Sequence, residues 1–339
     1  MGAFHMKNIL VTGGAGYIGS HMISALKEAG YHPVILDNLS TGHKSAVLDA
    51  ELVVTDIADQ TTLRAVFQTY KFSAVMHFAG FIRVGESVEN PAKYYQNNLA
   101  HSLNLLDVML EYKVKNLIFS SSAAVYGDPE YTPIDIAHPK HPINPYGQSK
   151  WMFEQILSDY DKAYGLKSTS LRYFNAAGAD PLARLGEWHD PETHLIPLIL
   201  QVASGRSQEI QVFGRDYPTK DGTCVRDYIH ICDLCQAHLL ALEALLQDGA
   251  STAYNLGNGN GYSVLEVIEM VKKVTGKNIK VKFSPRRAGD PAVLVADAEE
   301  AKQKLGWKPE FSDLEMIISH AWAWEQKLMT RHGVGNESE

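Results

Sequence analysis

A tyrosine and a lysine stand at i and i+4 in this chain, as Tyr146 and Lys150, and Ser122 lies upstream in a run of serines and alanines. Residues with this spacing share one face of a helix, so the phenol and the ammonium are expected to lie close together. A free tyrosine has a pKa near ~10 and is a poor proton acceptor at neutral pH. A neighbouring ammonium favours the phenolate and lowers that pKa, and a serine hydroxyl can hold the reacting oxygen. The trio therefore predicts proton transfer at a hydroxyl group, although Tyr-x-x-x-Lys alone also occurs on ordinary amphipathic helices.

The N-terminal segment predicts the elements that would position this trio beside a cofactor. Asn8 to Thr12 reads as a buried strand, Gly13 to Gly19 as a glycine-rich turn, and Ser20 to Ala29 as a helix. Strand, turn and helix in this order are the setting of a dinucleotide fingerprint. Gly16 lets the backbone approach a pyrophosphate at the helix N-terminus, and Gly19 lets the helix pack against the strand.

A carboxylate follows at the position where such a fold holds a ribose. The second predicted strand, Pro33 to Leu36, leads into Asp37, about 20 residues after Gly16. A carboxylate there accepts hydrogen bonds from the ribose hydroxyls and repels a 2′-phosphate, which favours NAD over NADP. The alternative for Asp37 is an ordinary turn residue at a strand end.

Alternation of short apolar runs with helical stretches defines the first half of the chain. Further strands are expected at Leu52 to Val54, Ala74 to Phe78, Asn116 to Phe119 and Leu166 to Tyr173. Long helices are expected from about Pro91 to Tyr112 and from Tyr146 to Tyr164. Continuous apolar strands separated by helices predict an α/β fold with a doubly wound parallel sheet of the Rossmann type.

The second half is less regular and predicts a smaller mixed α/β lobe over the carboxyl ends of the strands, where ligands of open α/β sheets bind. A helix is expected from Leu195 to Ser204 and a strand from Ile210 to Phe213, whereas Tyr228 to Ile231 and Ala253 to Leu256 are expected to return to the main sheet. Ser263 to Glu266 and Ser312 to Glu315 match capping boxes, each opening a helix. The predicted division is a cofactor domain at 6–174 with returning segments at about 226–256, a substrate lobe at 175–225 and 257–330, a cloning remnant at 1–5 and a loose tail at 331–339.

Composition limits the classes of function. The chain has 339 residues, 45% hydrophobic and 21% charged, with a net charge of −8 and no basic stretch, so nucleic acid is not an expected partner. There is no signal-peptide pattern and no apolar run near the ~20 residues that span a bilayer. Three cysteines favour a reducing, cytoplasmic setting. Cys232, Cys235 and His238 have metal-like spacing, but no fourth ligand accompanies them and no metal is predicted.

Taken in order, these segments resemble the extended short-chain dehydrogenase/reductase superfamily and, within it, the UDP-glucose 4-epimerase family. The resemblance runs from Asn8 to about Trp324. Its motifs are Gly-Gly-Ala-Gly-Tyr-Ile-Gly-Ser-His at 13–21, Asp37 to Ser40, Val84 to Ser87, Tyr94 to Asn98, Ser120 to Gly127, Tyr146 to Lys150, Arg172 to Asn175, Asp221 to His230 and Pro285 to Asp290.

The resemblance implies a reaction: NAD accepts a hydride from C4 of a UDP-hexose, Tyr146 takes the C4 hydroxyl proton through Ser122, and Lys150 lowers the tyrosine pKa. The 4-keto sugar then turns, and the hydride returns to its other face. Residues implied to bind the cofactor are Gly13, Gly16, Tyr17, Ile18, Gly19, Asp37, Asn38, Asp56, Ile57, Phe78, Ala79, Asn97, Ser120, Tyr146, Lys150 and Tyr173. Residues implied to bind the UDP-sugar are Ser122, Tyr146, Asn175, Leu195, Phe213, Arg226, Arg287, Asp290 and Leu294. The resemblance also implies a homodimer through the two long helices.

Alternative activities are weighed by the residues around the trio. Related 4,6-dehydratases carry an Asp-Glu pair after the active-site serine or threonine, whereas Ala123 and Ala124 follow Ser122 here. Related UDP-glucuronate decarboxylases usually have an acid near the same point. Dehydration and decarboxylation are therefore disfavoured. A 4-epimerase for another nucleotide sugar, such as a UDP-uronate or UDP-pentose, and a non-catalytic NAD sensor remain as alternatives.

Two positions depart from the family pattern. Many epimerases have a lysine shortly after the Phe-Ala-Gly segment, whereas this chain has Phe81-Ile82-Arg83, with the cation one place later. No role is assigned to Arg83. At Leu294, family members with tyrosine tend to exclude N-acetylated sugars and members with a small residue tend to admit them. Leucine is intermediate in volume and lacks the phenol, so activity on the N-acetylated pair is a hypothesis.

Overall fold

The computed structural model describes residues 6–287 and 289–334 of the chain. The predicted cloning remnant at 1–5 and the last part of the predicted tail, 335–339, lie outside the described residues. Helix α11 (Leu314–Val334) continues through 331–334. The prediction of a loose tail is therefore wrong for these four positions, where the helix has not yet ended.

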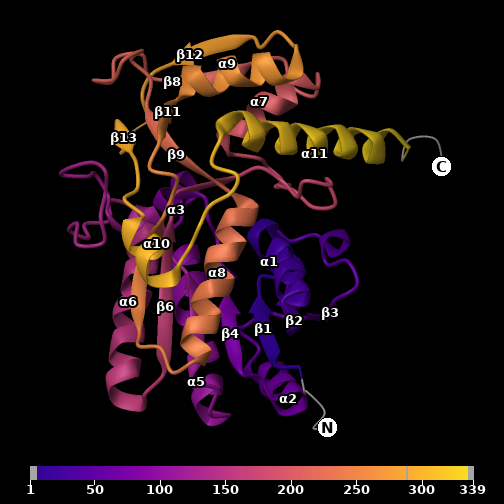
Figure 1. The fold of residues 1–339 in the computed structure, drawn as a ribbon, viewed down its shortest axis with the longest axis vertical. Coiled ribbons are helices and arrows are strands. Elements are labelled where there is room, and N and C mark those ends of the chain that lie inside the picture. The colour runs from indigo at the N-terminus through magenta and orange to yellow at the C-terminus, as the bar shows by residue number, and fades with distance from the viewer. Residues whose placement is uncertain (1–5, 288, 335–339) are drawn as a thin grey trace.

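A seven-stranded parallel sheet forms the larger part of the molecule (Figure 1). Its strands, in their order across the sheet, are β3 (Glu51–Val54), β2 (His32–Asp37), β1 (Asn8–Thr12), β4 (Ala74–His77), β5 (Asn116–Ser120), β6 (Lys167–Tyr173) and β10 (Thr252–Leu256). The first six follow the Rossmann order, with a topological switch point between β1 and β4. The predicted doubly wound sheet is confirmed, including the return of β10.

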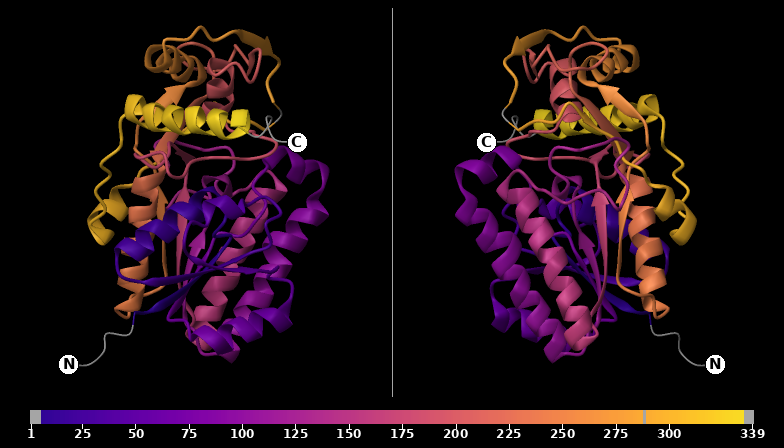
Figure 2. Two further views of the ribbon diagram at one scale, coloured as in Figure 1. Left: turned by 90° about the vertical axis from the view of Figure 1, so that its right-hand side faces the viewer. Right: turned by 90° about the vertical axis from the view of Figure 1, so that its left-hand side faces the viewer.

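Helices cover both faces of this sheet, which explains why its central strands are apolar on both sides (Figure 2). On one face α1 (Tyr17–Glu28) and α8 (Ile231–Leu246) contribute Met22, Leu26 and Leu242 to a buried cluster. On the other face a second cluster is formed by α2 (Gln60–Tyr70), α5 (His101–Glu111) and α6 (Pro145–Tyr164). The first helix begins at Tyr17, earlier than predicted, directly after Gly16.

The helix predicted from Pro91 to Tyr112 is not regular along its length. It consists of α4 (Pro91–Tyr95), a π-helical turn η2 (Gln96–Ala100) and α5. Such turns often occur at functional sites. The turn carries Asn97, one of the predicted cofactor residues.

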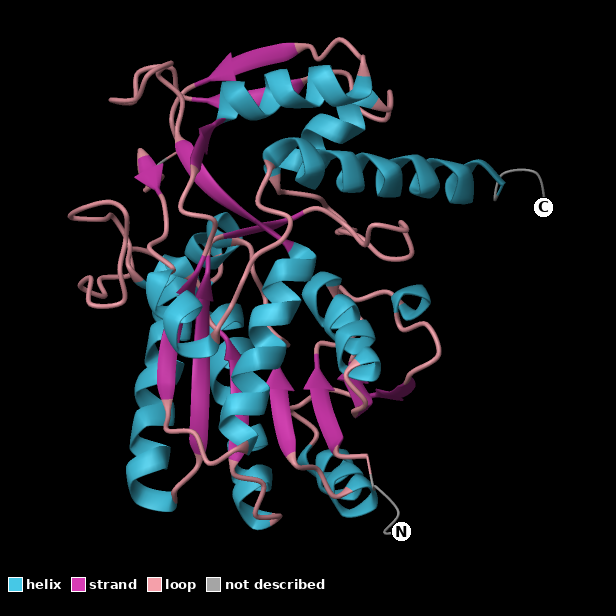
Figure 3. Ribbon diagram, viewed as in Figure 1, coloured by secondary structure: helices cyan, strands magenta, loops and turns pink. Residues whose placement is uncertain are grey.

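The smaller lobe lies beyond the carboxyl ends of the main strands, toward which the strand arrows point in Figure 3. Strand β9 (Val225–His230) pairs with β7 (Asn175–Ala177), β11 (Gly261–Ser263) and β13 (Val293–Leu294), and β8 (Ile210–Phe213) pairs with β12 (Val281–Ser284). The expectation that Tyr228 to Ile231 returns to the main sheet is therefore wrong. β9 instead follows the turn-rich segment after β8 into the second sheet.

Helices α7 (Leu195–Ala203), α9 (Val264–Thr275) and α11 pack together in the core of this lobe. The capping box at Ser263 and Glu266 is present, as predicted. The one predicted at Ser312 is wrong by one residue, because α11 begins at Leu314 and Asp313 accepts the backbone N–H of Glu315 at 2.6 Å.

Short helical segments complete the described fold: η1 (Lys44–Ala46), α3 (Val84–Glu89), η3 (Ala123–Val125) and α10 (Glu299–Leu305). Among the described residues, no helix is both long enough and apolar enough to cross a bilayer.

Candidate active site

A cleft of about 1110 Å³ separates the carboxyl ends of the main strands from the smaller lobe. Its volume is above the ~300–1,000 Å³ usual for one drug-sized ligand. All predicted site residues line it except Leu195 and Phe213. Those that line it are Gly13, Gly16, Tyr17, Ile18, Gly19, Asp37, Asn38, Asp56, Ile57, Phe78, Ala79, Asn97, Ser120, Ser122, Tyr146, Lys150, Tyr173, Asn175, Arg226, Arg287, Asp290 and Leu294.

The segment Gly13 to Gly19, from the end of β1 into α1, has no room for a side chain at Gly13 or at Gly19. Gly13 has φ +73° and lies against the backbone of Phe78 and Ala79. A Cβ on Gly19 would lie 2.2 Å from the carbonyl oxygen of Gly13, whereas one on Gly16 would meet only that oxygen, at 3.4 Å. Gly16 thus presents bare backbone to the cleft at the first turn of α1. This is the surface that a pyrophosphate requires.

Asp37, at the end of β2, lies beside this turn. Its two carboxylate oxygens accept the backbone N–H groups of Ala15 at 2.9 Å and Leu39 at 2.8 Å. Burial raises the pKa of the carboxyl group, and the two hydrogen bonds oppose that rise. The next loop residue, Asn38, donates to Asp56 at 2.6 Å. The fixed carboxylate keeps lone pairs free to accept from a ribose, so the residues fit a dinucleotide.

The floor of the cleft is formed where β4 ends. An asparagine that the sequence analysis missed, Asn98, holds this segment through its side chain. It accepts from the backbone of Phe81 at 2.8 Å and donates to the Phe81 carbonyl at 2.9 Å. The adjacent Asn97 donates to Asn98 at 2.9 Å. The π-helical turn therefore fixes the loop after β4, a long-range contact that no local pattern reveals.

The proposed proton-transfer trio comes together from two elements. Ser122 caps the N-terminus of η3, and its hydroxyl accepts the backbone N–H of Ala124 at 3.1 Å. Tyr146 and Lys150 lie in the first turns of α6, which Asn144 caps by accepting from Gly147 at 2.8 Å. The Lys150 ammonium donates to the Ser120 carbonyl at 2.9 Å and lies 5.9 Å from the centre of the Tyr146 ring.

Burial dominates the electrostatics of the trio. It raises the pKa of the Tyr146 phenol, against a hydrogen bond with Ser122 that lowers it. Burial also lowers the pKa of Lys150 to about 8. The net pKa of Tyr146 is therefore raised, because desolvation outweighs the hydrogen bond with Ser122, and the predicted lowering by Lys150 stays a prediction.

A buried ion pair that the sequence analysis missed supports the strand end behind Ser122. Arg172 makes a bidentate pair with Glu154, with its Nη2 2.5 Å from Oε2, and Ser121 donates to the same carboxylate at 2.5 Å. The Nη1 atom of Arg172 donates to the Tyr126 hydroxyl oxygen at 3.0 Å. Glu154 lies one turn after Lys150 on α6, and that spacing was the available signal.

On the opposite wall, strands of the smaller lobe present the residues implied to bind the diphosphate. Asn175 begins β7, and Arg226 lies on β9 beside Leu294 of β13. Arg226 also forms a short ion pair with Asp290. This pair holds the guanidinium at the cleft.

Phe213 and Leu195 lie behind this wall rather than on it. The Arg287 guanidinium lies over the Phe213 ring at 3.9 Å, so Phe213 supports a cleft residue. Leu195 begins α7 and packs against the core of the smaller lobe. Arg83, which has no assigned role, lines the cleft and lies 3.5 Å from Glu86.

The residues of α8 with metal-like spacing, Cys232, Cys235 and His238, are not grouped as metal ligands within the described residues. Cys235 and His238 are buried, and the His238 ring pairs with the Leu234 carbonyl at 2.8 Å. Within the described part of the chain, one group of side chains could hold a metal ion: Glu187, His189, Glu192 and His194. This group was not among the predicted metal ligands. The alternating spacing Glu-x-His-x-x-Glu-x-His was the available signal.

Comparison with known proteins gives consistent matches. The model of the "NAD dependent epimerase/dehydratase family" matches residues 9–257. A UDP-glucose 4-epimerase of Halalkalibacterium halodurans is 49% identical over 98% of both chains. The structure of a Brucella ovis UDP-glucose 4-epimerase with NAD superposes with a TM-score of 0.91, at 50% identity over 94% of this chain and 98% of that one. A Bifidobacterium longum UDP-glucose 4-epimerase with NAD+ and UDP also gives 0.91, at 40% identity over 95% and 98%.

Proposed function

Because the chain belongs to the NAD dependent epimerase/dehydratase family, we propose that it interconverts UDP-glucose and UDP-galactose by NAD-dependent epimerisation at C4. The observation that carries the proposal is the placement of Ser122, Tyr146 and Lys150 in one cleft with the glycine-rich turn. Bound NAD supplies a hydride acceptor that is regenerated in each cycle.

The cofactor residues are assigned by their place in the cleft. Backbone of the segment Gly13 to Gly19 receives the pyrophosphate at the start of α1, and Asp37 receives a ribose. Asn38, Asp56 and Ile57 enclose the adenine end. Ser120 and Tyr173, whose hydroxyl oxygens are 2.5 Å apart, lie with Phe78, Ala79 and Asn97 toward the reacting end.

Proton transfer is assigned to Tyr146, with Ser122 holding the C4 oxygen of the sugar between them. The Lys150 ammonium stabilises the phenolate that forms, which is the role a cation one turn away can serve. Because the phenol is buried, the proton is exchanged with the sugar rather than with bulk water.

The substrate is held through its nucleotide, which leaves the hexose free to turn. Asn175, Arg226 and Arg287 are assigned to the diphosphate, where arginine forks match the oxygen geometry. Asp290 is assigned to the uridine ribose, and Leu195 and Phe213 shape the uracil side from behind the cleft wall. Leu294 faces the sugar.

A 4-epimerase fits the surroundings of the trio better than a dehydratase does. Ala123 and Ala124 line the cleft directly after Ser122, so no carboxylate stands where a dehydratase needs its acid and base. The reaction therefore stops at hydride removal and return.

The decisive assay is conversion of UDP-galactose to UDP-glucose by purified protein without added NAD. Turnover is expected because the cleft encloses the cofactor. Turnover only after NAD is added would mean that the cofactor is lost on purification. Inactivity under both conditions, with UDP-uronates or UDP-pentoses converted instead, would contradict the assignment to glucose and galactose.

The N-acetylated pair, UDP-GlcNAc and UDP-GalNAc, is a second substrate class. Leu294 supports it, because it lines the cleft and is smaller than a tyrosine. Leu294→Tyr is expected to lower turnover of the N-acetylated pair at least about tenfold while preserving that of UDP-galactose. Background activity of the wild type on UDP-GlcNAc would contradict this part of the proposal.

The organisation of the active protein is proposed with the function. Residues 6–174, with the returning segment that ends in β10, form the cofactor domain, and 175–225 with 257–330 form the substrate lobe. A cytoplasmic homodimer through α5 and α6 is proposed, and Leu103 and Tyr160 are half-buried on those helices. Sedimentation at twice the monomer mass is expected.

A further inference from the structure

Four potential metal ligands gather at one point in the loop between β7 and α7. They are Glu187, His189, Glu192 and His194, and their ligand atoms all lie within 4.8 Å of one another. The Glu187 and Glu192 side chains are only 6% and 4% exposed. The proposed epimerisation uses none of the four, although Glu187, His189 and His194 line the same cleft.

The separations between these atoms are close to those of a tetrahedral site. With bonds of about 2.0–2.1 Å, two ligand atoms on tetrahedral zinc lie about 3.3 Å apart. The Nδ1 atom of His189 lies 3.4 Å from Glu187 and 3.5 Å from Glu192. The Nδ1 atom of His194 lies 2.7 Å from Glu187 and 3.2 Å from Glu192. Nitrogen and oxygen donors therefore surround a common point.

Hydrogen bonding within the cluster does not account for all of its atoms. The 2.7 Å contact between His194 and Glu187 has hydrogen-bond length. The Nδ1 atom of His189 is shielded from solvent and makes no hydrogen bond of good geometry within the described residues, although the Glu187 and Glu192 carboxylates lie 3.4 and 3.5 Å from it. A shielded nitrogen between two carboxylates, without a well-aligned hydrogen bond, has room for a better partner. An ion at the common point would bind it.

Charge balance also allows an ion in place of two protons. Two protonated imidazoles with two carboxylates are neutral, and so are two neutral imidazoles, two carboxylates and one divalent cation. Binding would release the imidazole protons to solvent. Two nitrogens and two oxygens suit Zn²⁺ better than Mg²⁺ or Ca²⁺, which prefer oxygen ligands throughout.

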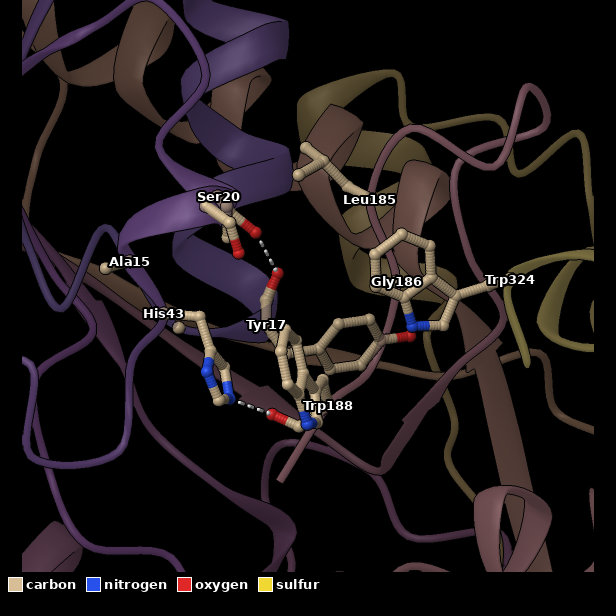
Figure 4. Close-up of a pocket in the computed structure, with 11 residues that line it drawn as sticks. Ala15, Tyr17, Ser20, His43, Leu185, Gly186, Trp188 and Trp324 are labelled. Atoms are coloured by element: carbon tan, nitrogen blue, oxygen red, sulfur yellow. Dashed lines mark hydrogen bonds between the residues drawn. The ribbon is translucent and has the colours of Figure 1, made fainter. Parts of the chain in front are cut away.

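We propose that Glu187, His189, Glu192 and His194 form a Zn²⁺ site that fixes this loop against the glycine-rich turn. The loop already contacts that region before the cluster and within it. The Tyr17 hydroxyl donates to the Gly178 carbonyl at 2.8 Å, and the Tyr17 ring meets His189 edge-on at 6.4 Å between centroids. Trp188 stacks on His43 at 3.8 Å, as Figure 4 shows beside Tyr17.

This geometry assigns the ion a structural role. All four ligands come from the segment Glu187 to His194, so the ion closes one local loop and leaves no position for the sugar. A fixed loop keeps Tyr17 and the turn in place, so slower loss of the cofactor is expected when zinc is bound.

The test measures metal content, not activity. Untagged protein is equilibrated with Zn²⁺, passed through a desalting column and analysed by mass spectrometry for metals. About one zinc per chain is expected. His189→Gln is expected to retain less than a tenth of that amount. His43→Gln is the matched control, because it alters a histidine at the same contact but outside the cluster, and it is expected to retain zinc.

Thermal unfolding gives a second readout. Chelation is expected to lower the Tm of the wild type and of His43→Gln but not that of His189→Gln. If His189→Gln does not fold, Glu192→Gln carries the same expectation, because it removes one carboxylate at nearly constant volume. Zinc absent from the folded wild type, or retained equally by His189→Gln, would overturn the site and leave an imidazole–carboxylate cluster. Preferential retention of Mn²⁺ from an equimolar mixture would overturn the assignment to zinc.

Discussion

At the scale of single residues, burial decides the chemistry of the proposed trio. Tyr146 and Lys150 lie one turn apart on α6. Desolvation nevertheless raises the pKa of Tyr146 and lowers that of Lys150, so it disfavours the charged form of each. The pair is therefore less ionised than its spacing suggests. Proton transfer to Tyr146 must depend on charge brought by the ligands as well as on Lys150.

Removing the phenol hydroxyl tests the proton-transfer role. Tyr146→Phe is expected to lower turnover by about 10²–10⁴-fold, the usual contribution of general acid–base catalysis, while the protein retains NAD. Coupled spectrophotometric assay and the absorbance of the bound cofactor measure the two effects. Tyr164→Phe, at the exposed end of the same helix, is the control and should match the wild type. Unchanged turnover in Tyr146→Phe would exclude it as the acid–base group.

The buried ammonium of Lys150 gives a pH dependence of stability with a definite sign. Its pKa is lowered to about 8 from 10.5, so between these values the folded state releases a proton that the unfolded state keeps. Stability therefore rises with pH in this window. At about 1.4 kcal/mol per pKa unit, the wild type should gain about 3 kcal/mol relative to Lys150→Met between pH 7 and 10.5. Urea unfolding of both proteins measures it, and parallel pH curves would contradict the buried charge.

At the scale of elements, the glycines where β1 leads into α1 serve two separate requirements, packing and cofactor binding. Gly19 is required by packing, because a Cβ there would meet the Gly13 carbonyl oxygen at 2.2 Å. Gly16 has space for a Cβ but faces the cleft. One fingerprint therefore contains a structural glycine and a binding glycine.

Alanine substitution should separate these two roles. Gly19→Ala is expected to destabilise the fold by about 1–3 kcal/mol, the usual cost of overpacking. The free energy of unfolding of Gly16→Ala should lie within about 0.5 kcal/mol of the wild-type value. The variant should nevertheless hold NAD at least about tenfold more weakly. Denaturant unfolding and cofactor titration measure the two. Equal loss of stability in both variants would show that Gly16 is also needed for packing.

At the scale of the whole molecule, residues from two sheets line the cleft. The main sheet supplies the cofactor side, and β7, β9 and β13 supply Asn175, Arg226 and Leu294 on the other. A nucleotide that contacts both sides should stabilise the pair of lobes by linkage, by about 2.7 kcal/mol at a hundredfold excess over Kd.

Two neighbouring arginines test this linkage. Arg287 lines the cleft over Phe213, whereas Arg286 turns to Asp216, with Nε 2.7 Å from its carboxylate, and lies over Tyr217. UDP is expected to raise the Tm of the wild type and of Arg286→Met, and to raise that of Arg287→Met by less than half as much. Equal Tm shifts in the two variants would contradict the assignment of Arg287 to the diphosphate.

The parallel sheet, the glycine-rich turn and the trio could be predicted from the residues alone, because each depends on local spacing or on apolar periodicity. Those patterns did not determine that β9 belongs to a second sheet, since an apolar strand pairs equally well in either one. Nor did they reveal that Asn98 holds Phe81, that Glu154 binds Arg172, or that burial raises the pKa of Tyr146. These are long-range contacts and desolvation effects, which depend on how distant segments pack in the folded chain. The Glu187 to His194 cluster lies between the two cases, because its spacing is local but only the folded loop turns all four side chains toward one point.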